Sequence, residues 1–216
     1  MFEQKAYRAF LFDMDGTILT SIAAAERVWT RWAKQHKLAL ERFIPTIHGA
    51  RAVDTIGKLN LPGVDPVKEA DLITQWEMDD VEGISPIGGA AEFLASLPDK
   101  QWAIVTSAPY ELALRRIEAA GLPVPKVLVA ADHIKNGKPA PDGYLTAMQK
   151  LGVTAEQSLI FEDAEVGIKA AHAAGSDLVV ITETHHQDFN GEQVNVENYI
   201  GLEVMVEGGE MRLVQK

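Results

Sequence analysis

The hydrophobic positions of the chain form short, almost wholly apolar runs, and most of these runs are followed by a stretch with helical spacing. Unbroken apolar runs of this length are typical of parallel strands buried on both faces, and their alternation with helices is typical of βαβ units. The pattern therefore predicts an α/β fold with a parallel sheet between helices. Strands are expected at 9–12, 102–105, 127–130, 159–161 and 178–181, and helices at 110–120, 143–151 and 166–174.

Residues 20–85 interrupt this alternation. Apolar positions there follow helical spacing over 25–36 and again over 66–79, and no strand pattern lies between them. We therefore predict a small helical cap, residues 20–85, inserted into a core that is made of residues 1–19 and 86–216.

Two further patterns concern packing rather than chemistry. Three of the four tryptophans, Trp29, Trp32 and Trp76, fall inside the predicted cap, and we expect them to form its apolar core rather than to stack on a ligand. Near the C-terminus, residues 203–207 and 210–214 alternate around two glycines, which is typical of a tight hairpin. We expect this hairpin to extend one edge of the sheet.

The composition is that of an ordinary globular protein, with 47% hydrophobic and 24% charged residues in a chain of 216. There are 20 basic and 31 acidic residues, so the net charge is -11 with neutral histidine, which repels a phosphate backbone. The chain has no cysteine, which excludes disulfides, thiolate nucleophiles and cysteine-ligated metals. We expect a cytoplasmic monomer that binds neither nucleic acid nor membranes, since no apolar run approaches the ~18 residues of a membrane span.

The strongest candidate for chemistry lies directly after the first predicted strand. Residues 12–17 read FDMDGT, so Asp13 and Asp15 follow the end of a parallel strand, where open α/β sheets bind their ligands. Gly16 allows the sharp turn that brings backbone groups close to a ligand. A calcium loop is the rival interpretation, but Ile18 stands where that loop requires glycine, and no helix precedes the aspartates.

Polar residues also follow the other predicted strands. They are Thr106-Ser107, Lys138 in the segment GKPAPD, and Glu162-Asp163. Any one of them alone would be an ordinary surface residue. Because the carboxyl ends of parallel strands share one edge of a sheet, we expect these three elements and the aspartate pair to meet at that edge.

With these four elements in this order, the sequence resembles the haloacid dehalogenase-like (HAD) hydrolases over nearly the whole chain. The aspartate pair, the Thr-Ser pair, the lysine of G-K-P-x-P-D and the acidic pair match the four motifs of that family. The resemblance implies a Rossmann-like parallel sheet core, and the helical insertion after the first motif matches a C1 cap. Residues 47–54 and 104–107 look most like those of sugar-phosphate and polyol-phosphate phosphatases.

The resemblance implies a Mg²⁺-dependent phosphatase that acts on a small phosphorylated metabolite. Asp13 would attack phosphorus and form an aspartyl-phosphate, and Asp15 would protonate the leaving group and then activate a water molecule. The implied metal ligands are Asp13, Asp163 and, through its backbone carbonyl, Asp15, with Glu162 as a further ligand or as a neighbour of one.

The same resemblance assigns the groups that would bind the substrate. Lys138, Thr106 and the backbone N–H of Ser107 would hold the phosphoryl group. In the cap, His48 and Arg51 would contact the rest of the substrate. For His48, a hydrogen-bonded structural role is the alternative.

Two other functions stay open at this point. A sugar phosphomutase shares these motifs, but Ala108-Pro109 makes the loop after Ser107 stiffer and less polar than a second phosphate site would require. A binding protein on an inactive HAD fold is the other alternative, although every matched position holds a competent residue. His185 and His186 are expected to be solvated, because no partner stands at metal-ligand spacing.

Overall fold

The computed structural model of the protein describes residues 5–184 and 194–215. Its main element is a six-stranded sheet in the order β5-β4-β1-β6-β7-β8, in which every neighbouring pair is parallel. The strands are β1 (Ala9–Phe12), β4 (Trp102–Val105), β5 (Val127–Val129), β6 (Ser158–Glu162), β7 (Asp177–Ile181) and β8 (Val194–Val196). The predicted parallel α/β sheet is confirmed. The sequence pattern does not predict β8, because only the three residues Val-Asn-Val form it.

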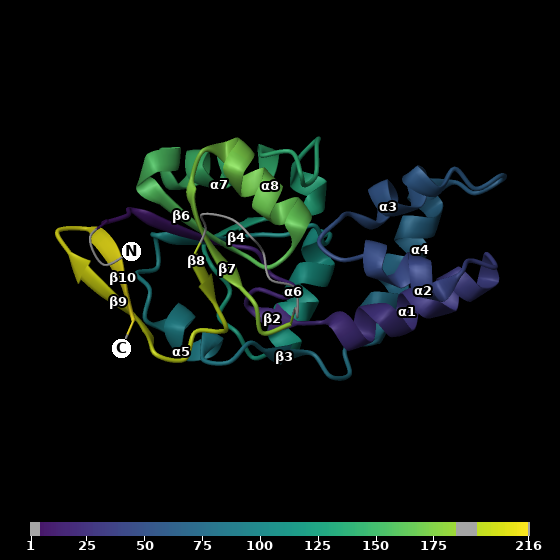
Figure 1. Ribbon diagram of the computed structural model, residues 1–216, viewed down its shortest axis with the longest axis horizontal. Coiled ribbons are helices and arrows are strands. Elements are labelled where there is room, and N and C mark those ends of the chain that lie inside the picture. Colours follow the sequence, from purple (N-terminus) through teal and green to yellow (C-terminus); the bar gives the residue numbers. More distant parts are fainter. Residues whose placement is uncertain (1–4, 185–193, 216) are drawn as a thin grey trace.

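Helices cover both faces of this sheet (Figure 1). On one face lie α5 (Ala90–Ala95) and α6 (Tyr110–Ala119), and on the other lie α7 (Asp142–Leu151) and α8 (Glu165–Ala174). Successive side chains of a strand point to opposite faces, so Phe10 and Phe12 enter the apolar cluster with α5 and α6, whereas Leu11 enters the cluster with α7 and α8. Burial on both faces is the reason for the unbroken apolar runs.

The strand order changes direction between β1 and β6. From β1 the chain proceeds to β4 and β5 on one side, and from β6 it proceeds to β7 and β8 on the other. The connections that leave β1 and β6 therefore diverge to opposite faces and leave a crevice at the carboxyl edge of the sheet. Open α/β sheets bind their ligands in such a crevice.

The C-terminal hairpin departs from the prediction. β9 (Leu202–Glu207) and β10 (Glu210–Gln215) pair antiparallel, but they form a separate two-stranded sheet. Met211 and Leu213 of β10 turn into the apolar cluster beside β1, and Tyr7 bridges to Met211 just before β1 begins. The sheet edge beside β7 is taken by β8. The hairpin is therefore held by burial of its apolar side chains, and the prediction that it extends a sheet edge is wrong.

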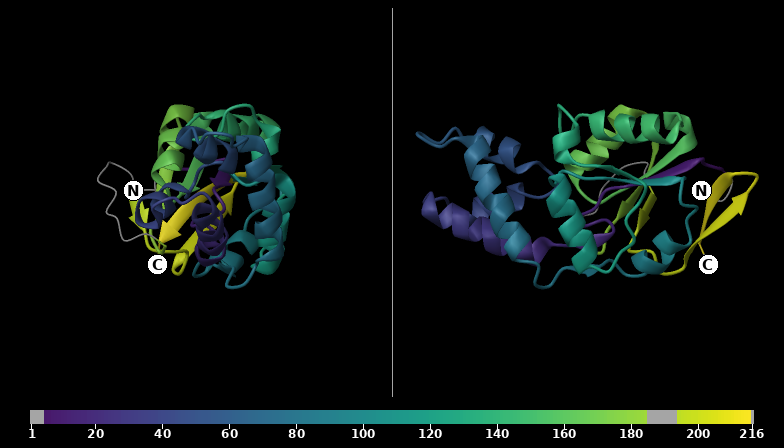
Figure 2. Two further views of the ribbon diagram at one scale, coloured as in Figure 1. Left: turned by 90° about the vertical axis from the view of Figure 1, so that its right-hand side faces the viewer. Right: turned by 180° about the vertical axis from the view of Figure 1, so that it is seen from behind.

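Between β1 and α5 the chain leaves the sheet and returns to it. β2 (Leu19–Thr20) and β3 (Ser85–Pro86) form a short antiparallel ribbon where this insertion begins and ends. Within it lie α1 (Ile22–Gln35), α2 (Leu40–Phe43), the 3₁₀ turn η2 (Ile44–Thr46), α3 (Ala52–Leu59) and α4 (Pro66–Asp79). The insertion stands beyond α6, at the opposite end of the molecule from the hairpin, as Figure 2 shows from behind.

The insertion has an apolar cluster of its own, built from α1, α2, α3 and α4. Trp29 and Trp32 are buried in it and Trp76 packs against it, which confirms that the tryptophans form the core of this segment. Trp32 is fully buried, and its indole N–H donates to Glu69 Oε2 at 2.7 Å. Trp29 also lines the pocket between the insertion and the sheet.

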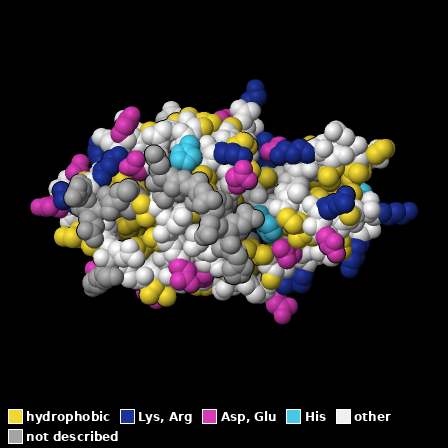
Figure 3. Space-filling view, viewed as in Figure 1, with side chains coloured by type: hydrophobic (Ala, Val, Ile, Leu, Met, Phe, Trp, Pro, Cys, Tyr) yellow, Lys and Arg dark blue, Asp and Glu magenta, His cyan; other side chains and the backbone are white. Residues whose placement is uncertain are grey.

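Of the helices within residues 5–184 and 194–215, none is long and apolar enough to cross a membrane. On the face shown in Figure 3, acidic and basic side chains are interspersed among apolar ones over both the sheet region and the insertion. The predicted solvation of His185 and His186 concerns residues outside the described part of the chain.

Trp32→Ala should lower the free energy of unfolding by about 3–5 kcal/mol, because it leaves a cavity in the cluster that orders the insertion. It also removes the indole donor of Glu69. The measurement is denaturant unfolding followed by circular dichroism. Val67→Ala, at a residue of α4 that is 59% exposed, is the matched control and should stay within about 0.5 kcal/mol of the unmodified protein. Equal losses in the two variants would contradict the prediction.

Candidate active site

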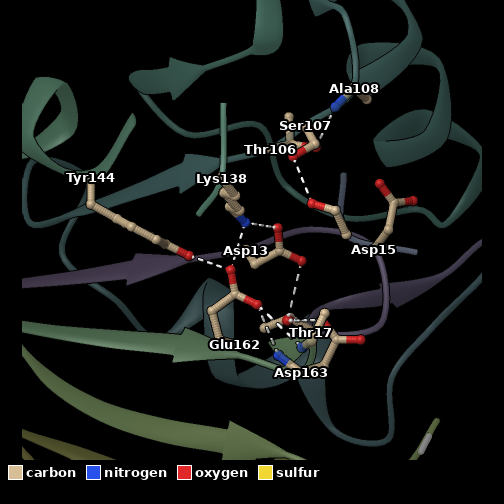
Figure 4. A network of polar contacts seen from close by, with 12 residues as sticks. Asp13, Asp15, Thr17, Thr106, Ser107, Ala108, Lys138, Tyr144, Glu162 and Asp163 are labelled. Carbon is tan, nitrogen blue, oxygen red and sulfur yellow. Dashed lines mark hydrogen bonds and ion pairs between the residues drawn. The ribbon is translucent and has the colours of Figure 1, made fainter. Parts of the chain in front are cut away.

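The polar residues that follow β1, β4 and β6 meet at the carboxyl edge of the sheet (Figure 4). Asp13 follows β1, Thr106 follows β4, and Glu162 is the last residue of β6. The backbone N–H of Asp13 donates to the Phe161 carbonyl, and that of Thr106 donates to the Val129 carbonyl, both at 2.9 Å. The hydrogen bonding of the sheet thus continues one residue beyond the strands and places these side chains rigidly.

Three carboxylates lie close together at this edge. Asp13, Glu162 and Asp163 are buried, and each offers an oxygen within 4.8 Å of those of the other two. The buried Lys138 donates its Nζ to Asp13 Oδ1 and, at 2.6 Å, to Glu162 Oε1. Charges can be buried only where partners replace the lost water, and Lys138 balances one of these three negative charges. The surplus negative charge suits a divalent cation.

Glu162 is engaged on both of its oxygens. Oε1 accepts from Lys138 Nζ at 2.6 Å and from the Tyr144 hydroxyl at 2.7 Å. Oε2 accepts from the backbone N–H of Asp163 at 3.1 Å and from that of Ala164 at 3.4 Å. These four donors fix the carboxylate, so Glu162 holds Lys138 in place against Asp13.

The burial of this cluster changes the acidity of its members. Loss of water raises the pKa of Asp13, Lys138 lowers it, and Glu162 and Asp163 raise it, with the result well above the usual value. Burial lowers the pKa of Lys138, but Asp13 and Glu162 outweigh burial and raise the pKa above its usual value. Lys138 therefore stays charged at neutral pH. A further cation beside Asp13 would favour its carboxylate form.

Sequence reasoning gave no role to two side chains at this edge. Thr17 Oγ1 lies 3.3 Å from Asp13 Oδ2 and 3.2 Å from Asp163 Oδ1, within reach of both carboxylates. The sequence could have indicated Thr17 as a site residue, because it belongs to the same FDMDGT segment as the two aspartates. Tyr144 carries no such signal, since it stands in an ordinary helical pattern 18 residues from Glu162.

Asp15 faces away from the three carboxylates (Figure 4). Its Oδ1 accepts from Ser21 Oγ at 2.5 Å, and its Oδ2 accepts from Arg116 Nη1 at 3.0 Å. The other guanidinium nitrogen, Nη2, lies 3.1 Å from Glu77 Oε1. Ser21 and Glu77 belong to the insertion, and Arg116 belongs to α6. Sequence reasoning did not single out Arg116, which stands next to the more exposed Arg115.

A pocket lies between the insertion and the carboxyl edge of the sheet. It is lined by Asp13, Asp15, Thr106, Ser107 and Asp163 on one side and by residues of the insertion that include Trp29, His48 and Glu77. Both aspartates of the FDMDGT segment therefore open onto one pocket, although their hydrogen-bond partners differ. Lys138 reaches this pocket through its contact with Asp13 rather than as part of the lining.

Of the predicted substrate and phosphate contacts, His48, Thr106 and Ser107 line this pocket. His48 does so with its Nε2 3.4 Å from Glu26 Oε1. Ser107 also does so, and its hydroxyl donates to the Gly49 carbonyl of the insertion at 2.9 Å. Ser107 therefore joins the sheet side of the pocket to the insertion.

Arg51 is placed differently from the prediction of a substrate contact. Its Nε donates to Asp54 Oδ2 at 2.6 Å and its Nη2 to Asp54 Oδ1 at 3.1 Å. Its Nη1 donates to the Lys135 carbonyl at 3.1 Å, so the guanidinium bridges the insertion and the loop before α7. The structure does not bring Arg51 into the lining of the pocket.

Comparison with known proteins agrees with this architecture. The family model of haloacid dehalogenase-like hydrolases matches residues 7–175. Hexitol phosphatase A of Escherichia coli is 37% identical over 182 residues, which cover 81% of this chain and 82% of that protein. 2-Deoxyglucose-6-phosphate phosphatase 2 of Saccharomyces cerevisiae is 36% identical over 197 residues, which cover 81% of this chain and 80% of that protein.

Among solved structures, β-phosphoglucomutase from Clostridium difficile shares the fold, with a TM-score of 0.76, 18% identity, and coverage of 89% of this chain and 91% of that one. At this identity the similarity concerns the fold alone. The family model, by contrast, spans most of the chain, and both phosphatases align with about four fifths of it. The chain therefore belongs to the haloacid dehalogenase-like hydrolases.

Proposed function

We propose that this hydrolase is a Mg²⁺-dependent phosphatase that cleaves small sugar or polyol phosphate monoesters through an aspartyl-phosphate. The observation that carries the proposal is the environment of Asp13, a buried carboxylate at the pocket that contacts Lys138 and lies beside Asp163. The substrate class is supported by relatives named as a hexitol phosphatase and a 2-deoxyglucose-6-phosphate phosphatase.

In the first half of the reaction Asp13 is the nucleophile. One of its carboxylate oxygens forms a bond to phosphorus while the bond between phosphorus and the ester oxygen breaks. The leaving oxygen takes a proton from Asp15, which opens onto the same pocket. The products of this half are the free alcohol and an aspartyl-phosphate on Asp13.

In the second half Asp15, now a carboxylate, takes a proton from a water molecule that attacks the phosphorus of the aspartyl-phosphate. The bond between phosphorus and Asp13 breaks and inorganic phosphate leaves. Asp15 is protonated again and Asp13 is again a carboxylate, so both residues return to their starting state.

The phosphoryl group carries negative charge throughout both halves. Lys138 supplies a fixed positive charge through its place beside Asp13, and we assign Thr106 and the backbone N–H of Ser107 as donors to the phosphoryl oxygens. In a chain with a net charge of -11, this local charge offsets the repulsion of an anionic substrate.

The donor set at the sheet edge suits Mg²⁺, which prefers carboxylate and carbonyl oxygens and keeps several water molecules. We assign the carboxylates of Asp13 and Asp163 and the backbone carbonyl of Asp15 as its ligands. Glu162 is not assigned as a ligand, because its oxygens already accept from four donors. When bound, the cation would neutralise charge on the phosphoryl oxygens.

Gly16 keeps the loop that carries two of these ligands close to Asp163. Its φ is +90°, in the region that L-residues rarely adopt, and a Cβ atom there would overlap the Asp163 carboxylate. A side chain at this position would therefore separate Asp163 from the backbone of the aspartate loop.

We propose that residues 20–85 act as a cap over a catalytic core of residues 1–19 and 86–216. The ribbon of β2 and β3 lies at this boundary, where Leu19 pairs with Pro86. The cap would cover the pocket, exclude water and contact the alcohol portion of the substrate.

Within the cap, His48 is assigned to substrate contact because it lines the pocket. Arg51 is assigned to holding the cap on the core, because its guanidinium already binds Asp54 and the Lys135 carbonyl. A sugar phosphomutase has less support, since Ala108 and Pro109 line the pocket with apolar side chains where a second phosphate would need donors.

Asp13→Asn should lower phosphate release by about 1,000-fold or more, because the amide cannot act as the nucleophile. The measurement is phosphate release from hexitol, deoxyhexose, glycerol and nucleotide monophosphates with and without Mg²⁺. The unmodified protein should need Mg²⁺ and prefer the sugar and polyol esters. Asp99→Asn, at a side chain 81% exposed, is the control and should retain full activity. Undiminished release by Asp13→Asn would rule out Asp13 as the nucleophile.

Asp163→Asn should abolish stabilisation of the protein by Mg²⁺. For the unmodified protein, a Mg²⁺ concentration of 100 times Kd should raise the free energy of unfolding by about 2.7 kcal/mol. Differential scanning calorimetry with and without Mg²⁺ measures this shift, with Asp99→Asn again as the control. If Asp163→Asn responded to Mg²⁺ as the unmodified protein does, the assignment of Asp163 as a ligand would fail.

Gly16→Ala should weaken Mg²⁺ binding as well as the fold, because the new Cβ displaces Asp163. Gly63→Ala is a matched control, since Gly63 has a φ of +75° but open space around a built Cβ. Both variants should be destabilised by about 1 kcal/mol or more from backbone strain, whereas only Gly16→Ala should lose the Mg²⁺-induced shift in calorimetry. An unchanged shift in Gly16→Ala would show that the loop position does not matter for the metal.

A further inference from the structure

The guanidinium of Arg116 joins the second aspartate of the motif to the insertion. Arg116 lies on α6, and 8% of its side chain is exposed. Its Nη1 donates to Asp15 Oδ2 at 3.0 Å. From its other nitrogen it reaches Glu77 Oε1 at 3.1 Å, and the Glu77 side chain is 10% exposed. One planar cation from the core thus binds two carboxylates, one beside the reacting centre and one in α4 of the insertion.

This contact restricts where the Asp15 carboxylate can point. Oδ2 is held by Arg116 from the core and Oδ1 by the Ser21 hydroxyl from the start of the insertion. Without both donors, the Asp15 side chain, which is 25% exposed, would turn among several rotamers. Asp15, Ser21, Arg116 and Glu77 all line the same pocket as Asp13.

The two aspartates of the FDMDGT segment are therefore held by different cationic side chains. Asp13 contacts Lys138, whereas Asp15 contacts Arg116 and lies apart from the network around Glu162 (Figure 4). A lysine ammonium is a point charge, but the fork of an arginine can bind two carboxylates with defined directions. Because one guanidinium binds both carboxylates, the position of Glu77 affects the position of Asp15 through Arg116.

We propose that Arg116 is a positioning residue that aims the Asp15 carboxyl at the leaving-group oxygen, and that Glu77 makes this aim depend on the docked cap. The inference rests on the proposed phosphatase function and assigns a role that the four motifs do not contain. Arg116 itself would not touch the reacting atoms. In the first half-reaction its effect would appear only where the leaving group needs a proton from Asp15, whereas in the second half-reaction it would be the same for every ester.

The test compares two esters that differ in their need for that proton. An alkyl phosphate such as glycerol phosphate releases an alkoxide that must be protonated, whereas p-nitrophenyl phosphate releases a stable anion. In Arg116→Met, the single-turnover rate of alcohol release from the alkyl phosphate should fall by about 100-fold, the size of a general-acid contribution. The single-turnover rate of p-nitrophenol release should change by less than about 3-fold, because this step isolates the first half-reaction from the hydrolysis of the aspartyl-phosphate, and the KM of both esters should change little.

The neighbouring arginine supplies a matched control. Arg115 is 39% exposed and pairs with Glu118 on the same helix, so Arg115→Met should leave both rates unchanged. Arg116→Lys keeps a cation at the site and should recover part of the loss on the alkyl phosphate. It also provides the same comparison of esters if Arg116→Met does not fold, which circular dichroism and thermal unfolding will reveal.

Glu77→Gln tests the dependence on the cap. It should lower the single-turnover rate of alcohol release from the alkyl phosphate by a smaller factor than Arg116→Met does, again with little effect on the release of p-nitrophenol. Combined with Arg116→Met it should add little, because both variants act through the same guanidinium. Full additivity of the two losses would overturn the role assigned to Glu77.

Other outcomes overturn the role of Arg116. Equal losses in the single-turnover release of the alcohol and of p-nitrophenol would mean that Arg116 only maintains the fold or the docked cap. A raised KM with unchanged kcat would mean that it binds substrate. If the unmodified protein releases phosphate from neither ester, the proposed function fails first and the inference fails with it.

Discussion

The buried ammonium of Lys138 requires carboxylate partners at the carboxyl edge of the sheet. A charge without water or partners is strongly destabilised inside a protein, so Lys138, Asp13 and Glu162 are tolerated there only together. Asp13 continues β1, Glu162 ends β6 and accepts from the next two backbone N–H groups, and Lys138 extends from the turn before α7. The Tyr144 hydroxyl adds a restraint from α7. The cluster of Lys138, Asp13 and Glu162 is thus held by the core, whereas the Ser107 hydroxyl is held by the Gly49 carbonyl of the insertion.

The insertion is attached by contacts of another kind. Its own apolar cluster holds its helices together. It meets the core through apolar side chains such as Ala24 and Ile84, which enter the cluster beside β1. Around the pocket it also makes polar contacts, namely Ser107 with Gly49, Arg51 with Lys135, and Glu77 with Arg116. Water can replace the more exposed of these contacts, such as that of Arg51 with the Lys135 carbonyl, at modest cost, whereas breaking the buried pair of Arg116 and Glu77 would leave two charges without a partner. In the proposed function, opening of the insertion about the β2-β3 ribbon would admit substrate while the cluster around Lys138 stays in place, and the pair of Arg116 and Glu77 would favour the closed state.

The sequence predicted those features that depend on burial and strand order. β1 and β4 are buried on both faces, so their apolar runs were visible, and the sharing of one edge by parallel strands predicted that Asp13 would meet Lys138. Contacts that depend on how a helix is rotated and packed were not predictable, because no local sequence pattern indicates them. Tyr144 of α7 contacts Glu162, and Arg116 of α6 contacts Asp15. Arg51 illustrates the same limit, since Asp54 lies one helical turn away and captures the guanidinium that the motif alone would direct at a substrate.

Asp13 and Asp15 are separated by one residue, yet the structure gives them different surroundings. The loop turns their side chains in opposite directions, and each meets its own cation. Asp13 lies deep among like charges, where a fixed ammonium and a divalent ion would favour its carboxylate form. Asp15 is more exposed and bound to an arginine shared with the insertion. In the proposed function, two identical side chains serve as nucleophile and acid because their environments differ. Here that difference arises from Lys138, in the turn before α7, and from Arg116 of α6.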